Sequence, residues 1–115
     1  MKVTIYHNPR CSKSRQTLAL LQDRGIAPEI IEYLNTPPDA ATLKRILKQL
    51  DLAPRDLMRR KEAVYRELEL DDAGLGDDEL VAAMVDNPVL IERPIVLAGG
   101  RAALGRPPER VLEIL

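Results

Sequence analysis

Residues 3–33 run from a strand pattern through a helix pattern to a second strand pattern, and this order constrains the fold more than any other feature. The apolar run Val3–Tyr6 predicts a buried strand. A helical pattern follows over about residues 12–24, with Gly25 placed to end it. A further apolar run predicts a strand over residues 28–33. A strand–helix–strand unit of this length places the two strands parallel in one sheet.

The middle of the chain is helical by its periodicity. Asp39 is placed to cap a helix whose apolar positions recur at i, i+3, i+4 and i+7. Shorter helices are predicted from Arg55 to Arg60 and from Glu62 to Leu68, and another begins at Asp77 and ends before Pro88. These elements form a helical insertion over roughly residues 39–86, between the second and third strands.

The last part of the sequence returns to strand patterns. Pro94–Leu97 predicts a strand, Gly99-Gly100 a hairpin turn, and Arg101–Leu104 an antiparallel partner strand. Pro107-Pro108 then opens a final helix. Residues 1–115 are therefore expected to form a single α/β domain whose four-stranded sheet is flanked by helices.

Composition narrows the class of protein. One cysteine among 115 residues cannot form an internal disulfide, which suits a reducing compartment. The sequence shows neither a signal peptide nor a membrane-length apolar run, so we expect a cytoplasmic protein without membrane contact. The net charge of −1 argues against a nucleic-acid partner, because such surfaces carry a basic excess.

That single cysteine, Cys11, lies where the first strand passes into the first helix. Unpaired backbone N–H groups and the positive end of the helix dipole favour a thiolate there. Nearby cations, including Arg15, act in the same direction. A cysteine that serves only in packing does not need these neighbours, so Cys11 is the candidate nucleophile.

Cys11 and Ser14 have the spacing of a redox CxxC motif with serine in the second position. Ser14 can hydrogen-bond a thiolate but cannot close a disulfide, so an adduct on Cys11 must be resolved by a thiol from another molecule. A phosphatase loop is disfavoured, because Thr17 stands where that motif needs arginine.

Other candidate site residues are dispersed along the chain. His7 could give the Cys11 sulfur a positive charge or a hydrogen bond, and with one histidine and one cysteine we expect no metal site. Arginine suits tetrahedral oxyanions through its planar fork, and three arginines stand out by position. These are Arg59 in the predicted short helix, and Arg93 and Arg106, each directly before a proline. Pro94 is a candidate for a cis peptide bond.

The loop sequence resembles the active-site loop of the glutaredoxin-coupled arsenate reductases; it reads His7-Asn8-Pro9-Arg10-Cys11-Ser12-Lys13-Ser14-Arg15. Later blocks resemble the same family in the same order, so the resemblance spans essentially the whole chain. These blocks are Glu32–Pro38, Leu57–Glu62, Asn87–Val96 and Gly105–Glu109.

The resemblance implies a thioredoxin/glutaredoxin-like fold with a mixed sheet in the strand order 2-1-3-4 and a helical insertion. It implies that the Cys11 thiolate attacks arsenate, that His7 and Ser14 assist the thiolate, and that arginines hold the oxyanion. The matching arginines are Arg59, Arg93 and Arg106; Arg60 is adjacent to the first, and we favour Arg59. Glutathione would act as co-substrate and glutaredoxin as partner, with no bound cofactor.

Two other functions remain open on the sequence. The CxxS spacing also fits a monothiol glutaredoxin-like oxidoreductase with another substrate. Some relatives of this fold are non-catalytic regulators that bind RNA polymerase, although these typically carry a CxxC switch that Ser14 removes here.

Overall fold

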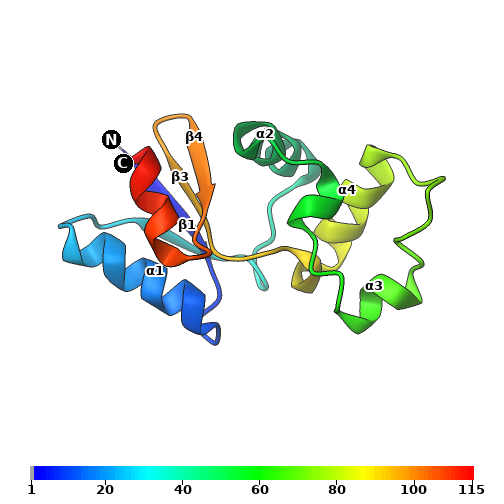
Figure 1. Ribbon diagram of the computed structural model, residues 1–115, viewed down its shortest axis with the longest axis horizontal. Coiled ribbons are helices and arrows are strands. Elements are labelled where there is room, and N and C mark those ends of the chain that lie inside the picture. The colour runs from blue at the N-terminus through cyan, green and yellow to red at the C-terminus, as the bar shows by residue number, and fades with distance from the viewer. Residues whose placement is uncertain (1) are drawn as a thin grey trace. The chain divides into compact units, whose positions relative to one another are not determined.

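The computed structural model describes residues 2–115 and divides into two compact units (Figure 1). The first unit runs up to Thr36 and resumes over Arg93–Leu115, so it combines both ends of the chain. The second unit is the continuous segment Pro37–Glu92. It contains the predicted helical insertion, whose expected range of 39–86 lies inside it.

The first unit is built on a four-stranded mixed sheet in the order β2-β1-β3-β4. Its strands are β1 (Val3–His7), β2 (Glu29–Glu32), β3 (Ile95–Ala98) and β4 (Arg101–Leu104). β1 pairs parallel to β2 and antiparallel to β3, and β3 pairs antiparallel to β4 across the Gly99-Gly100 turn. Both turn glycines have positive φ, which the tight hairpin requires. The predicted strand order and the parallel first pair are confirmed.

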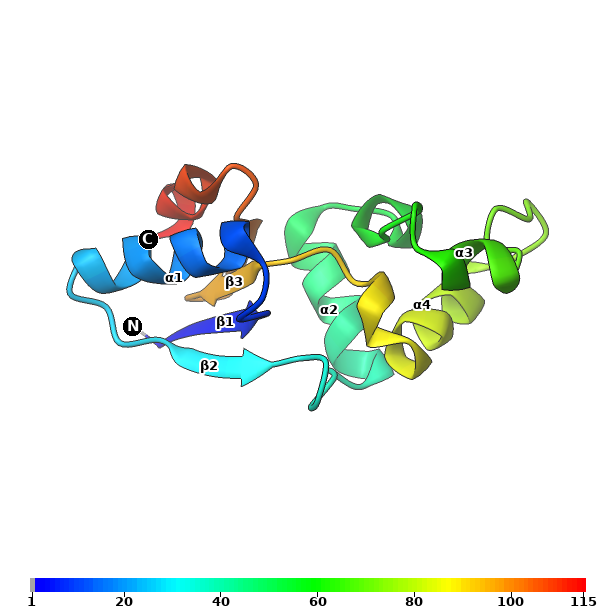
Figure 2. The same cartoon turned by 90° about the horizontal axis from the view of Figure 1, so that it is seen from below.

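Two helices cover one face of this sheet, α1 (Ser12–Asp23) and the 3-10 helix η3 (Pro108–Ile114). Figure 2 shows α1 lying along the strands. Side chains alternate across a strand, so Val3 and Ile5 of β1 point to the same face, where they meet Leu21 of α1 and Val111 of η3 in a buried aliphatic core. This core fixes α1, and with it the residue that precedes α1, against the carboxyl end of β1.

The second unit contains α2 (Ala40–Leu50), the 3-10 helix η1 (Pro54–Leu57), α3 (Ala63–Glu67), α4 (Asp77–Asp86) and the 3-10 helix η2 (Pro88–Leu90). As predicted, Asp39 caps α2, because its carboxylate accepts a 2.8 Å hydrogen bond from the Thr42 N–H. α2 packs against α4, and each buries an apolar stripe. These stripes are Leu43, Ile46 and Leu47 on α2 and Leu80, Val81 and Met84 on α4.

The prediction that a helix extends from Arg55 to Arg60 is wrong. The helix is a single 3-10 turn that ends at Leu57, and Arg59 lies outside it. Met58 instead forms an antiparallel bridge with Ile91, flanked by the hydrogen bonds Arg59 N–H to Leu90 O and Glu92 N–H to Leu57 O. This pairing with a distant segment holds Met58 in an extended conformation directly after η1, which local periodicity could not indicate.

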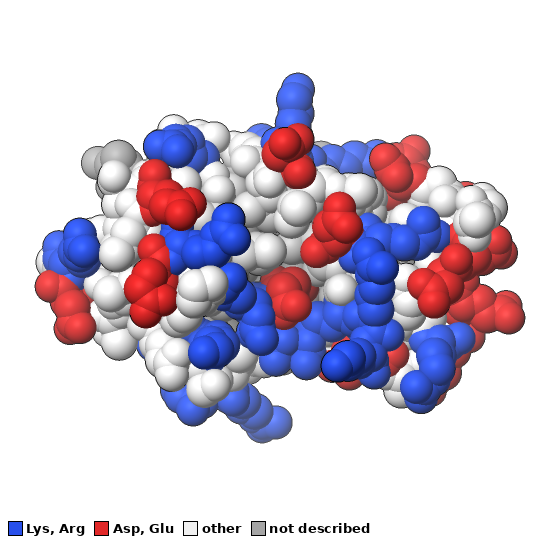
Figure 3. Space-filling view, in the orientation of Figure 1, with Lys and Arg blue, Asp and Glu red and all other residues white. Residues whose placement is uncertain are grey.

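The surface carries charges of both signs. Figure 3 shows Lys and Arg side chains interspersed with Asp and Glu on the face in view, as 17 basic and 18 acidic residues would suggest. Within residues 2–115, none of the helices has the length and apolar character needed to cross a membrane.

Candidate active site

Cys11 is the residue that caps the N-terminus of α1, and it is buried, with 8% of its surface exposed. Its backbone is extended, with φ −93° and ψ 123°, and its N–H donates a 3.0 Å hydrogen bond to the Asn8 carbonyl. Its own carbonyl accepts from the Arg15 N–H at 3.0 Å as the first helical bond. The thiol therefore projects from the point where the backbone N–H groups of α1 have no helical partner.

The environment lowers the pKa of the Cys11 thiol. Burial, the largest influence, raises the pKa, and four groups together outweigh it. The backbone N–H of Ser14 bonds to the sulfur, the charge of Arg93 acts next, and the N–H of Lys13 and the charge of Arg106 add to both. The predicted activation of Cys11 thus comes from helix N–H groups and two arginines that are remote in the sequence.

His7 and Ser14 form a buried polar pair beside this thiol. Nδ1 of His7 lies 2.6 Å from the Ser14 hydroxyl oxygen, and that oxygen also accepts a 3.0 Å hydrogen bond from the Asn8 N–H. Ser14 is fully buried because it lies on the face of α1 that also carries Thr17 and Leu21. The pair fastens the end of β1 and the following loop to the first turn of α1.

The pKa of His7 bears on which of its two predicted contributions, a positive charge or a hydrogen bond, the side chain can make. Burial lowers the pKa of the His7 imidazole, and the charge of Arg15 lowers it further, while Glu32 on the neighbouring strand raises it. The net shift is downward, which favours the neutral ring at neutral pH. A neutral imidazole serves as a hydrogen-bonding group toward Ser14.

Arg15 braces the loop that carries the cysteine. Its Nη1 donates a 2.9 Å hydrogen bond to the Pro9 carbonyl, and the side-chain carbonyl of Asn8 accepts from the Arg10 N–H at 3.0 Å. Arg15 was predicted to favour the thiolate by its charge. The structure adds a hydrogen bond from its side chain to Pro9, which holds the shape of the loop.

Arg93 and Arg106 come together in the first unit although 13 positions separate them in sequence. Nη1 of Arg106 donates a 3.3 Å hydrogen bond to the Arg93 carbonyl, and both charges lower the pKa of Cys11. Each arginine precedes a cis proline, Pro94 and Pro107. The sequence suggested the first of these cis bonds and gave no indication of the second.

Gly105 is a positioning residue that sequence reasoning missed. Its N–H donates to the Pro94 carbonyl at 3.0 Å. A Cβ atom added at Gly105 would lie 2.7 Å from Cγ of Pro94 and closer still to Oγ1 of Thr17. The chain can therefore pass between Pro94 and α1 only with glycine at this position. This close passage fixes the position of Arg106. In the sequence, the only sign of it is the Arg-Pro-Pro run that directly follows Gly105.

Arg59 belongs to the second unit. Its guanidinium forms an ion pair with Glu62, with Nη1 2.7 Å from Oε1, and the two side chains are 28% and 29% exposed. Its proposed role in binding an oxyanion stays a prediction.

The first-unit residues together provide the groups needed for nucleophilic attack on an anion. A thiolate is stabilised by N–H donors, and two guanidinium groups lie close enough to act on it. In the described part of the chain, no group of three or more His, Cys, Asp or Glu side chains is arranged to hold a metal ion.

The sequence and the fold of this chain are similar to those of known proteins. A model of the ArsC family matches residues 6–114. The chain is 59% identical to the uncharacterized protein YfgD of Escherichia coli, over 99% of this chain and 97% of that protein. It is 53% identical to an arsenate reductase of Neisseria meningitidis, over 99% and 98%. The structure is similar to an arsenate reductase from Vibrio cholerae, with a TM-score of 0.98, 59% identity and coverage of 100% and 98%. The predicted thioredoxin-like fold is confirmed.

Proposed function

Because the chain belongs to the ArsC family, we propose that it is an arsenate reductase that uses glutathione and glutaredoxin. The observation that carries the proposal is the set of groups acting on the Cys11 sulfur. Two backbone N–H groups and two arginines lower the pKa of a buried thiol, and the same arginines are suited to an oxyanion. Relatives at 53% and 50% identity bear the name arsenate reductase.

The first step is attack of the Cys11 thiolate on arsenic. A sulfur–arsenic bond forms and an arsenate oxygen leaves as water after taking up protons, so arsenic stays As(V). Arg93 and Arg106 hold the remaining oxygens and balance their charge as the adduct forms. We also assign Arg59 to oxyanion binding, on the likeness of its segment to the family.

Reduction occurs when glutathione attacks the adduct. The glutathione sulfur bonds to the Cys11 sulfur, the sulfur–arsenic bond breaks, and its electron pair stays on arsenic, which leaves as arsenite. The two thiols are thereby oxidised to a mixed disulfide on Cys11. Because the sequence holds one cysteine, glutaredoxin must reduce this disulfide and restore the thiol.

His7, Ser14 and Arg15 act as positioning residues in this scheme. Their hydrogen bonds hold the loop and the first turn of α1, so that the N–H groups of Lys13 and Ser14 remain directed at the sulfur. Because these N–H groups are already in place, they do not have to reorient when negative charge develops on the sulfur.

The test is arsenite production by the purified protein with glutathione, glutaredoxin and arsenate. We expect turnover that requires all three and that Cys11→Ser abolishes. No arsenite above background would refute the proposal. Activity on glutathione mixed disulfides that Arg93→Ala leaves unchanged would instead favour the monothiol oxidoreductase.

A further inference from the structure

The ion pair between Arg59 and Glu62 joins the two ends of a tight turn. The Glu62 N–H donates to the Arg59 carbonyl at 3.1 Å, which brings the carboxylate back over the arginine. Nη1 of Arg59 and Oε1 of Glu62 are then 2.7 Å apart, and less than a third of the surface of each side chain is exposed. A pair this close and this shielded is screened by solvent less than an ordinary surface pair.

The backbone of Arg59 is fixed independently of this pair. Its N–H donates a 2.7 Å hydrogen bond to the Leu90 carbonyl, and the preceding residue, Met58, bridges to Ile91. The guanidinium therefore projects from a rigid base whether or not Glu62 holds it, and Glu62 governs only what the guanidinium contacts.

Glu62 does not serve as a conventional helix cap. It occupies the N-cap position of α3, yet its side chain makes no capping hydrogen bond, and glutamate is not a favoured residue there. Its carboxylate is committed to Arg59 instead. The carboxylate is therefore held by the Arg59 guanidinium and not by the backbone N–H groups of α3.

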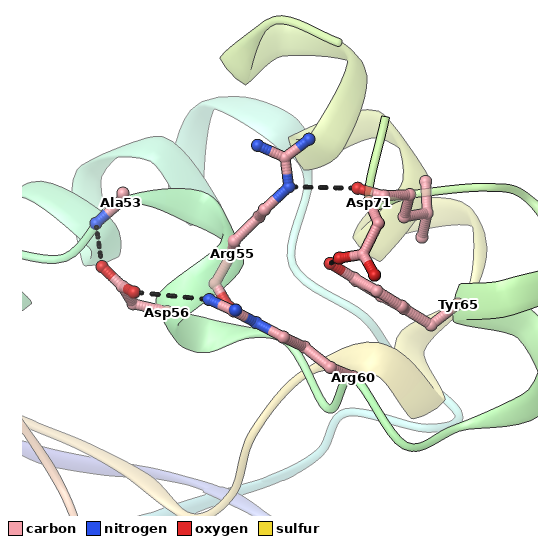
Figure 4. Close-up of polar contacts among 7 residues, drawn as sticks. Ala53, Arg55, Asp56, Arg60, Tyr65 and Asp71 are labelled. Carbon is pink, nitrogen blue, oxygen red and sulfur yellow. Dashed lines mark hydrogen bonds and ion pairs between the residues drawn. The ribbon is translucent and has the colours of Figure 1, made fainter. Parts of the chain in front are cut away.

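The neighbouring Arg60 is held differently. Its Nε donates to the Arg55 carbonyl at 3.2 Å and its Nη2 lies 3.6 Å from Oδ1 of Asp56, so it is braced against η1, as Figure 4 shows. The close-up also shows two nearby hydrogen bonds, from Nε of Arg55 to the Leu70 carbonyl and from the Tyr65 hydroxyl to the Asp71 carboxylate. Of the two adjacent arginines, Arg60 supports η1 and Arg59 faces a carboxylate in its own turn.

We propose that Glu62 is an internal carboxylate that occupies Arg59 until a tetrahedral oxyanion displaces it, and that Glu62 thereby sets the affinity for the anion. The inference rests on the proposed function, in which Arg59 binds the oxyanion. A carboxylate and an arsenate or phosphate oxygen engage guanidinium N–H groups in the same way. The bound anion must therefore replace one charge-assisted hydrogen bond of Arg59 with its own, and it does so against the negative charge of Glu62.

Calorimetric titration of the intact chain with inorganic phosphate tests this proposal. Phosphate has the shape and charge of arsenate and does not react with Cys11. Glu62→Gln keeps an oxygen acceptor for Arg59 but removes the charge, so we expect phosphate to bind about threefold more tightly or better. Glu67→Gln makes the same change in net charge at an exposed site of α3 and should leave the affinity unchanged.

The Arg59→Ala background identifies the partner of Glu62. There, Glu62→Gln should no longer alter phosphate affinity, because the two substitutions act through one contact. Unchanged or weaker phosphate binding by Glu62→Gln in the otherwise native chain would overturn the proposal, as would the absence of phosphate binding to any variant. Arsenite production by the native chain is measured separately. If the native chain makes arsenite while Glu62→Gln binds phosphate no more tightly, the proposal for Glu62 fails and the proposed function stands.

Discussion

Nδ1 of His7 lies 2.6 Å from the hydroxyl oxygen of Ser14, and both side chains are buried at the junction of β1 and α1. The Ser14 oxygen also accepts the Asn8 N–H, so one hydroxyl serves a side chain and a backbone group of the preceding loop. The sulfur of Cys11 is contacted by the backbone N–H of the same residue, Ser14. The side chain of Ser14 therefore fixes the loop, while its backbone stabilises the thiolate.

Ser14→Ala separates these two roles. The change leaves a buried imidazole nitrogen and the Asn8 N–H without this partner, which should cost about 1–3 kcal/mol in the free energy of unfolding. The backbone N–H remains, so the pKa of Cys11 should stay below that of a free thiol. Urea unfolding and the pH dependence of alkylation measure the two effects. A pKa restored to the free value with stability unchanged would contradict the assignment.

The lowered pKa of His7 predicts how stability depends on pH. The unfolded imidazole takes up a proton below about pH 6.5, whereas the folded one resists protonation until a lower pH. The unfolded state then binds more protons, so the free energy of unfolding should decrease as the pH falls from about 6.5 toward the folded pKa. In His7→Gln this part of the slope should disappear. Equal slopes in the two proteins, measured by urea unfolding at several pH values, would argue against a buried neutral histidine.

The arginines should control the reactivity of Cys11. The rate of alkylation should reach half its maximum below the free-thiol value of about pH 8.5. Arg93→Met and Arg106→Met keep apolar bulk but remove the charge, so each should move this midpoint upward, the first by more. Arg101→Met, at an exposed position of β4, is the matched control and should leave the midpoint unchanged. Equal effects of all three substitutions would mean that only net charge matters.

Gly105→Ala should destabilise the first unit. The added methyl group would meet Pro94 at 2.7 Å and Thr17 more closely, and overpacking of this kind costs about 1–3 kcal/mol. Gly76→Ala introduces a methyl group whose nearest neighbour is 3.8 Å away, so this control should lose only the smaller preference for glycine over alanine at the N-cap of α4. If thermal unfolding of Gly105→Ala matched the native protein, the close passage between Pro94 and α1 would be wrong.

Local pattern was sufficient to predict most of the secondary structure. The apolar run of β1, the Asp39 cap of α2 and the Gly99-Gly100 turn each carry their signal within a few residues. The predicted helix is wrong beyond Leu57, because Met58 is extended and pairs with Ile91, and that pairing leaves no periodic pattern in the sequence.

In the candidate site, too, local features could be predicted from the sequence and tertiary relationships could not. Cys11 and its position before α1 could be read directly from the sequence. The influence of Arg93 and Arg106 on Cys11 depends on β3 pairing beside β1 and on the passage of Gly105 past Pro94, which are both tertiary relationships. The positions of these two arginines before prolines and the family resemblance both indicated them in the sequence, but neither indicated that their charges act on the Cys11 thiol. The lowered pKa of His7 comes mainly from its burial, which is also a tertiary property.

The most direct test of the central claim is the intact mass of the protein after incubation with arsenate and glutathione in the absence of glutaredoxin. We predict that one glutathione becomes attached through a disulfide to Cys11, that this requires arsenate, and that glutaredoxin removes it. Cys11→Ser should remain unmodified. Equal glutathione attachment with and without arsenate, or none in either case, would contradict the claim that Cys11 attacks arsenate and is resolved by an external thiol.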